Sequence, residues 1–203
     1  MIPWSLSQTV APAAKPLSID RVLSHCRVEL GSPGCTGPDI DGWINSAREQ
    51  AELHTGRQLI TATFKMRLDY FPCGHIVLPK PPCQSVTSIE YYDPDGALQT
   101  WAAANYVVDA PSGEKAQNAR IFLATNASYP STQSRPAAVI ITFPAGYGLA
   151  DTSVPDSIKS AMLLRISALN ENREGSAGAF SARDLDASER LLSGFVTYMP
   201  ELR

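Results

Sequence analysis

The sequence predicts an α+β fold in which a bundle of helices from the N- and C-terminal parts carries an inserted antiparallel β unit. Apolar residues recur with a helical period up to residue 56 and again after residue 153. Between these points they alternate in short runs that leave no room for crossover helices, so neighbouring strands must pair mainly antiparallel. The chain has 203 residues, enough for one large domain or two small ones.

Residues 1–17 are rich in Pro, Ala and Ser and show no periodicity, which predicts an extended or disordered N-terminal arm. They have no basic stretch followed by a continuous apolar run, so we expect no secretory signal. No apolar run approaches the roughly 18 residues of a membrane span. We therefore expect a folded, soluble, intracellular protein without membrane contact.

Residues 18–56 are predicted to form the first part of the bundle, with two helices. Ser18 is a good N-cap for "IDRVLSHCRVEL", and "GSPGCTGPD" ends this first helix. The second helix is expected to start near Pro38 or Asp39, and Gly56 suits a left-handed C-terminal cap. The apolar stripe of the first helix has the i, i+3, i+4, i+7 spacing: Ile19, Val22, Leu23 and Cys26.

Residues 57–147 are predicted to be a compact β unit. "LITATFKMRLDYF" alternates, with one face from Ile60 through Phe64 to Tyr70. Six further short β-type runs follow: "HIVLP", "SVTSIEYY", "ALQTW", "NYVVDA", "ARIFLA" and "AAVIITF". The Asp93-Pro94-Asp95-Gly96 stretch between two of these runs is typical of a hairpin turn.

Residues 148–174 are predicted to complete the bundle, with a helix that starts at Ser153 through an S/T-x-x-D/E capping box. Residues 175–203 are predicted to be a polar, Gly/Ser-rich hinge followed by a C-terminal docking helix over about 184–198. Five residues form the apolar stripe that we expect to dock on a partner: Leu185, Leu191, Leu192, Phe195 and Tyr198.

Two short motifs resemble ligand loops but fail on spacing. After Gly146 and Gly148, the position of a third phosphate-loop glycine is Asp151, whose carboxylate would repel a phosphate. The two glycines are therefore interpreted as a joint. A calcium loop starting at Asp93 would need a glutamate at its twelfth position, which is Ala104, so this stretch is interpreted as a hairpin turn.

The sequence provides no clear catalytic or metal-binding set, and we expect no cofactor and no enzymatic activity. Its four cysteines and three histidines are scattered, without the paired spacing of a zinc site. His75 and Asp69 could still meet in space, which keeps open a small hydrolase or metalloenzyme as an alternative, beside a monomeric β-rich binding module. The net charge is −3, and no Lys/Arg stripe indicates tight DNA binding.

Five stretches together resemble the head–tail connector (adaptor) proteins of long-tailed phages and of phage-derived gene transfer agents. They are "INSAREQAELHTGRQLI" (44–60), "IVLPKPPCQSVTSIEYYDPDG" (76–96), "NYVVD" (105–109), "ITFPAGYG" (141–148) and "VPDSIKSAMLLRISALNENRE" (154–174). Order and spacing agree over about 130 residues. The N-terminal arm, the loop over 31–38 and the end after Glu174 depart from the family pattern.

The resemblance implies a non-enzymatic virion component located in the neck of a phage-like particle and assembled in the bacterial cytoplasm. Family members form a homo-oligomeric ring, commonly of twelve subunits, below the portal protein. The ring joins the portal to a tail-side stopper or tail-terminator protein, and DNA passes through its lumen without sequence-specific binding. In this family context, the partner of the C-terminal docking helix is expected to be the portal.

Overall fold

The computed structural model describes residues 4–171 and 182–198. The chain divides into two compact units, which we call the β unit (Met1–Pro12, Thr61–Gly146 and Thr197–Arg203) and the helical unit (Ala13–Ile60 and Tyr147–Val196). The predicted insertion of a β unit into a helical bundle is therefore confirmed. The assignment of the two chain ends differs from the prediction, because both belong to the β unit.

The helical unit contains α1 (Ile19–Cys26), α2 (Gly37–Thr55), α3 (Asp156–Glu171) and α4 (Ala182–Ser193). The expected end signals of α1 and α2 are present. Ser18 accepts a hydrogen bond from the backbone N–H of Arg21, and Asp39 accepts one from the N–H of Thr36, the N-cap residue of α2. Gly56 has a φ of 72°, the left-handed conformation that ends α2.

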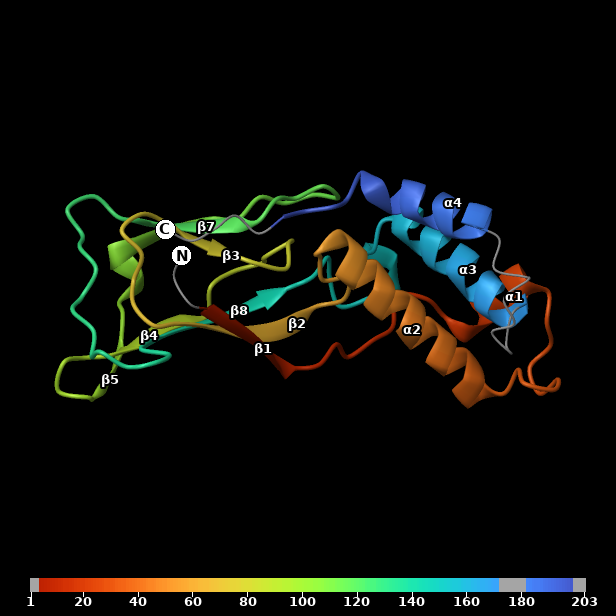
Figure 1. Cartoon of the computed structure of the whole chain (residues 1–203), viewed down its shortest axis with the longest axis horizontal. Helices are drawn as coiled ribbons and strands as arrows, with labels where there is room; N and C mark the ends of the chain where they lie inside the picture. Colours follow the sequence, from red (N-terminus) through yellow and green to blue (C-terminus); the bar gives the residue numbers. More distant parts are fainter. Residues whose placement is uncertain (1–3, 172–181, 199–203) are drawn as a thin grey trace. The chain divides into compact units, whose positions relative to one another are not determined.

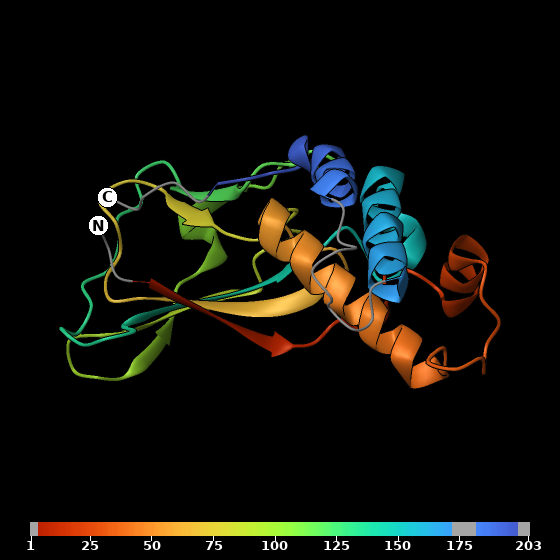
Figure 2. The ribbon, with the colours of Figure 1, turned by 45° about the vertical axis from the view of Figure 1, so that its right-hand side comes forward.

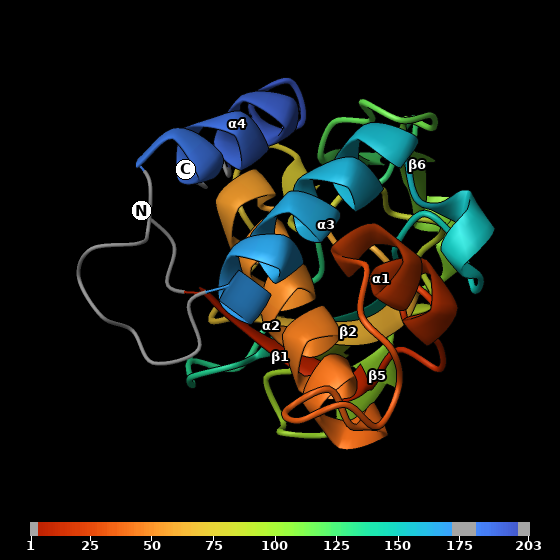
Figure 3. The same ribbon diagram turned by 90° about the vertical axis from the view of Figure 1, so that its right-hand side faces the viewer.

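Helix α3 is the centre of the helical unit and contacts each of the other three helices. Figure 3 shows it between α1 and α4, with α2 beside it. Its broad apolar face is confirmed, since Ile158, Met162 and Ile166 are fully buried or nearly so. They share a core with Ile40 and Ile44 of α2. None of the described helices is long and apolar enough to cross a membrane.

The predicted start of α3 is wrong by three residues. Asp151–Ser153 form a short 3-10 turn, and the α-helix begins only at Asp156. Ser153 instead donates its backbone N–H to the carbonyl of Ala150. Ser153 is thus the last residue of the 3-10 turn and not the start of the α-helix.

The β unit contains two antiparallel sheets, seen as separate layers in Figure 1. The five-stranded sheet has the order β1-β2-β8-β4-β5, and the three-stranded sheet has the order β3-β7-β6. Strand β8 pairs with β2 on one side and with β4 on the other, so strands that are not consecutive in the sequence are neighbours in this sheet. The strands are β1 (Trp4–Val10), β2 (Ala62–Leu68), β3 (Ile76–Leu78), β4 (Ser88–Tyr92), β5 (Leu98–Thr100), β6 (Tyr106–Asp109), β7 (Ala119–Leu123) and β8 (Val139–Ala145).

Strand β1 refines the prediction of an extended or disordered N-terminal arm, because its residues are extended and paired in the sheet. Residues 4–10 pair antiparallel with β2 along its whole length, from Trp4 opposite Leu68 to Val10 opposite Thr63. Leu6 packs against the core of the β unit. Trp4 and Leu6 lie on one side of β1 and Ser5 and Ser7 on the other, so the sequence has only a short alternation, and pairing with β2 holds the strand in place.

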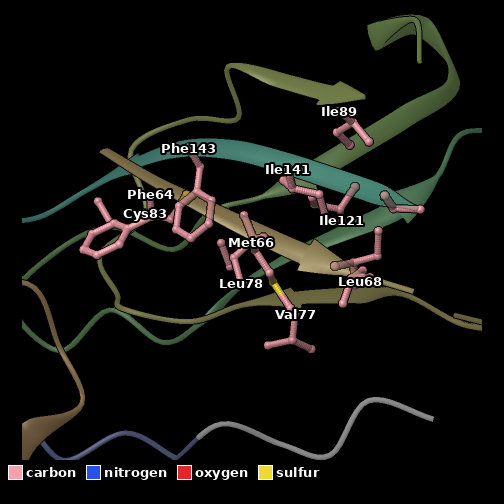
Figure 4. Close-up of a cluster of buried hydrophobic side chains, with 14 of the residues drawn as sticks. Phe64, Met66, Leu68, Val77, Leu78, Cys83, Ile89, Ile121, Ile141 and Phe143 are labelled. Atoms are coloured by element: carbon pink, nitrogen blue, oxygen red, sulfur yellow. The ribbon is translucent and has the colours of Figure 1, made fainter. Parts of the chain in front are cut away.

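The core of the β unit lies between the two sheets, where β2 and β8 contribute alternate side chains (Figure 4). Phe64 lies opposite Phe143, with ring centroids 5.9 Å apart, and Met66 lies opposite Ile141. The predicted alternation of β2 is confirmed from Ala62 to Leu68. It does not extend to Tyr70, whose side chain is exposed.

Stacked aromatic rings provide a second part of this core. Phe71 stacks on Tyr129 at 4.8 Å between centroids, and Trp101 stacks on Tyr106 at 5.2 Å. Trp101 also lies 5.4 Å from Phe71, which joins the two pairs. Aromatic contacts of this kind add about 0.5–1.5 kcal/mol each to the free energy of area burial. Trp101 is therefore a core residue.

Candidate functional site

The C-terminal residues predicted to dock on a partner do not share one exposed surface. Leu192 and Phe195 are each only 5% exposed and belong to the core of the helical unit. Leu191 and Tyr198 are exposed. The side chain of Leu185 lies outside the described part of the chain. The interpretation of Leu192 and Phe195 as residues that await a partner is therefore corrected: both are already covered by their own helical unit.

Figure 2 shows the helices of this unit, among which α4 contacts α2 and α3. Ser188 of α4 is buried and donates its hydroxyl to the carbonyl of Ala161 at 3.0 Å. A cavity of about 30 Å³ remains between the three helices, with Ala47 and Met162 in its wall. Helix α4 therefore forms a defined hydrogen bond with α3, while a small pocket remains beside it.

Arg57 is a buried residue that the sequence reasoning did not single out. It is 1% exposed, and its Nε donates to the carbonyl oxygen of Phe195 at 2.5 Å. Burial lowers the pKa of Arg57, while the nearby Tyr147 side chain opposes this change. Arg57 thus ties the residues after α2 to the residues after α4. A charged side chain is normally expected at the surface, so the sequence offered no signal for this role.

Gly146 and Gly148 lie at a joint, as predicted, because the β unit ends at Gly146 and the helical unit resumes at Tyr147. Gly146 has a φ of 135° and donates its N–H to the carbonyl of Pro82. A Cβ atom at Gly148 would collide with the hydroxyl of Ser153. Gly146 allows the chain to turn, and Gly148 allows close packing against Ser153. With the Gly146 N–H bound to Pro82 and Ser153 against Gly148, these residues do not form a phosphate-binding loop.

Asp93 and its neighbours form the predicted hairpin turn between β4 and β5. One carboxylate oxygen of Asp93 accepts the backbone N–H groups of Asp95 and Ala97, and the other accepts the side-chain amide of Gln99. The Gln99 contact first, and then that of Ala97, lowers the pKa of Asp93. Gly96 has a φ of 86°, which favours glycine. The carboxylate is therefore occupied by the turn itself.

The residues considered for catalysis serve other contacts. The His75 ring stacks on Phe122 at 5.0 Å between centroids, and Asp69 accepts the backbone N–H of Ala137. No ion pair joins His75 to Asp69 in the described part of the chain. The described residues also contain no group of three or more His, Cys, Asp or Glu arranged to hold a metal ion.

The outer surface of the five-stranded sheet is mostly polar, with Ile140 and Pro144 of β8 as half-buried apolar members, and we call it the polar face. The register places Ser7, Lys65, Thr142 and Ser88 in one row across β1, β2, β8 and β4. In the neighbouring row, Arg67 donates to the hydroxyl of Ser7 at 2.7 Å. The six residues that define this face are all half-buried: Ser7, Thr63, Lys65, Arg67, Ser88 and Thr142.

The outer surface of the three-stranded sheet has a different chemistry, and we call it the apolar face. Val107 of β6 lies directly opposite Phe122 of β7, and they are 56% and 37% exposed. The guanidinium carbon of Arg120 lies 5.5 Å from the centroid of the Phe122 ring. Arg120 also forms an ion pair with Asp109 at 2.7 Å, which neutralises its charge locally. An aromatic centre beside an arginine is typical of a protein–protein contact.

Comparisons with known proteins find matches among solved structures. No protein-family model and no curated protein sequence matches the chain. Three solved structures match along 97% of this chain and 97% of theirs. They are the neck of an empty gene transfer agent particle computed with C6 symmetry (TM-score 0.76, 22% identity), the virion of a native gene transfer agent particle (0.74, 21%) and the neck of a native particle computed with C12 symmetry (0.75, 20%).

At these sequence identities the likeness concerns the fold. It covers both units and almost the whole length of both chains. The protein thus has the α+β fold of chains in gene transfer agent particles, including the particle neck, as the resemblance in its sequence indicated.

Proposed function

We propose that this protein is a structural component of the neck of a phage-like particle, a head–tail connector that joins the portal to the tail-side proteins. The observation that carries the proposal is the full-length likeness to chains from gene transfer agent particles. A sequence resemblance found independently, over about 130 residues, supports the same role. The protein acts by assembly, and catalysis has no part in this function.

The assembled form in this proposal is a closed ring of twelve copies through which DNA passes. Support comes from the symmetry of the two solved necks, C6 and C12. A head-to-tail interface between identical subunits gives a ring when its rotation closes. The apolar face around Phe122 is suited to contact protein, and it contributes to an interface in the neck.

The proposed contact with the portal uses only those residues of the predicted docking stripe that are exposed. Leu192 and Phe195 hold α4 to its own unit, so the contact with the portal uses residues that remain exposed. Leu191, which is 37% exposed, and Tyr198, which is 84% exposed, are the members of the stripe that meet this condition. A tail-side stopper or terminator protein binds on the opposite side of the ring.

Removal of the gene from the source bacterium tests the proposal. A connector is needed after the head is filled, so we expect DNA-filled heads and separate tails, and almost no joined particles. Expression of the parent protein should restore joined particles, and the protein should copurify with them in several copies. Normal particles without the gene, or particles that lack the protein, would contradict the proposed function.

A further inference from the structure

We propose that the polar face lines the channel and that its occupant is the sugar–phosphate backbone of duplex DNA. This inference rests on the proposed function, which supplies a ring with a lumen. It adds which of the two outer surfaces of the β unit faces the DNA. Both surfaces belong to antiparallel sheets. They therefore differ in the chemistry of their side chains and not in the type of backbone pairing.

The charges of the polar face are few and nearly balanced. Lys65 and Arg67 form no ion pair with a described carboxylate, and Ile140 of β8 lies between Arg67 and Glu90 in their common row. At one end of the sheet, Arg135 lies 3.9 Å above the ring of Tyr92, while Asp69 binds a backbone N–H. The turn beside β5 adds two carboxylates, Asp93 and Asp95, to the surroundings of this face.

Hydroxyl groups dominate the rest of this surface. Ser7, Thr142 and Ser88 stand in one row with Lys65, and Thr63 lies two residues before Lys65 on the same face. Serine and threonine hydroxyls contact phosphate oxygens without adding charge. Each cation that neutralises a phosphate strengthens binding and its dependence on salt. A hydroxyl-rich face whose two cations form no ion pair with a described carboxylate therefore contacts moving DNA without retaining it.

The apolar face does not suit the same position. Val107 and Phe122 expose apolar area to solvent, and Arg120 is engaged by Asp109. Burial of such area against protein is favourable, whereas the wall of a channel that holds DNA remains hydrated. With protein assigned to the apolar face, the polar face is the surface of the β unit that remains for the lumen.

Site-specific photo-crosslinking in complete particles tests this assignment. A photoreactive benzoyl-phenylalanine replaces Thr142 on the polar face or, as the matched control, Val107 on the apolar face. Particles are irradiated before and during DNA release, and the purified chain is examined for attached DNA. We expect DNA attachment from position 142 at least tenfold above that from position 107.

The possible outcomes distinguish a failure of this inference from a failure of the proposed function. If the chain is in the particles but position 142 attaches to protein, or if position 107 attaches to DNA, the inference is wrong and the connector role stands. If the chain is absent from the particles, the proposed function and the inference both fail. DNA attachment from position 142 alone supports the inference.

A gain of charge provides the second measurement. The double variant Thr63→Lys, Thr142→Lys adds two cations per copy to the polar face, and Val107→Lys, Gln117→Lys adds two elsewhere in the β unit. We expect the first variant to slow DNA release and the second to leave it unchanged. An increase of salt from 50 to 200 mM should weaken the added contacts by about tenfold per copy and restore release. Equal release by both variants, with both chains folded and incorporated, would contradict the inference.

Discussion

The two units of this protein are stabilised in different ways. In the β unit, large side chains meet directly across the strands, as Phe64 meets Phe143 and Met66 meets Ile141, and aromatic stacks extend this core. In the helical unit, the described residues that hold the last helix include Leu192, Phe195 and Ser188, beside a small pocket of about 30 Å³. The comparison indicates that changes near the C-terminus will weaken the helical unit first.

Deletion of residues 184–203 is expected to have the largest effect. It removes two buried side chains that each contribute about 1.5–3 kcal/mol, so the helical unit should lose about 3–6 kcal/mol of stability. It also leaves the buried Arg57 without the Phe195 carbonyl. We expect thermal unfolding followed by circular dichroism to show an early loss of helix, with the sheet signal retained to a higher temperature.

This expectation follows from the burial of Leu192 and Phe195 in the helical unit, whereas a helix that only docked on a partner could be removed without loss of stability. A melting curve of the truncated chain that coincides with that of the parent would mean that the contacts of Leu192 and Phe195 contribute little. The distinction between the two units would then be wrong.

Single substitutions compare a buried and an exposed side chain within the C-terminal segment. Phe195→Ala should lower the free energy of unfolding by about 3–5 kcal/mol, because it removes a buried ring and leaves a cavity. The matched control is Tyr198→Ala, where the side chain is 84% exposed and the change should stay within about 0.5 kcal/mol. Urea unfolding measures both, and equal effects of the two substitutions would refute the assignment of Phe195 to the core.

A smaller effect is expected at the joint between the units. Gly148→Ala places a methyl group against the side chain of Ser153 and should cost about 1–3 kcal/mol. Ser153→Gly removes the obstructing atoms, so the double variant should recover most of this loss. A double-mutant cycle by urea unfolding checks the coupling. If the two changes simply add, the close approach of these residues is not the reason for the glycine.

The smallest effect concerns the hairpin turn of the β unit. The pKa of Asp93 is lowered in the folded protein, chiefly by Gln99, so the charged form is favoured. Its contribution is present above the unfolded pKa of about 3.9 and is lost as the pH falls through the lower folded value. Asp93→Asn should therefore unfold more readily than the parent at pH 6, with the difference shrinking towards pH 3. A difference that is the same at both pH values would contradict the role of the charge.

Local signals in the sequence predicted much of the fold. The caps at Ser18 and Gly56 and the alternation of β2 depend on neighbouring residues, and the structure contains all three. Strand β1 depends on pairing with residues 53 or more positions away, and its own alternation of Trp4 and Leu6 with serines is too short to predict a strand by itself. The burial of Arg57 likewise depends on a carbonyl 138 residues further along the chain.

The candidate site was harder to predict for a similar reason. The apolar stripe of the last helix indicated that Leu192 and Phe195 would be buried against a hydrophobic surface. The pattern does not tell whether that surface belongs to the same chain or to a partner. The three-dimensional arrangement provides that surface within the same chain. The polar face could not be recognised from the sequence either, because Ser7, Lys65, Thr142 and Ser88 come together only through the order β1-β2-β8-β4.

The central claim is that this protein forms a ring in the particle neck, and its direct test is electron cryo-microscopy of particles from the source bacterium. The chain should be tagged at one end so that its copies can be located. The account predicts a closed ring of twelve copies between the portal and the tail, with DNA density along its axis. Tagged protein found outside the neck, or present there as a single copy, would contradict the account.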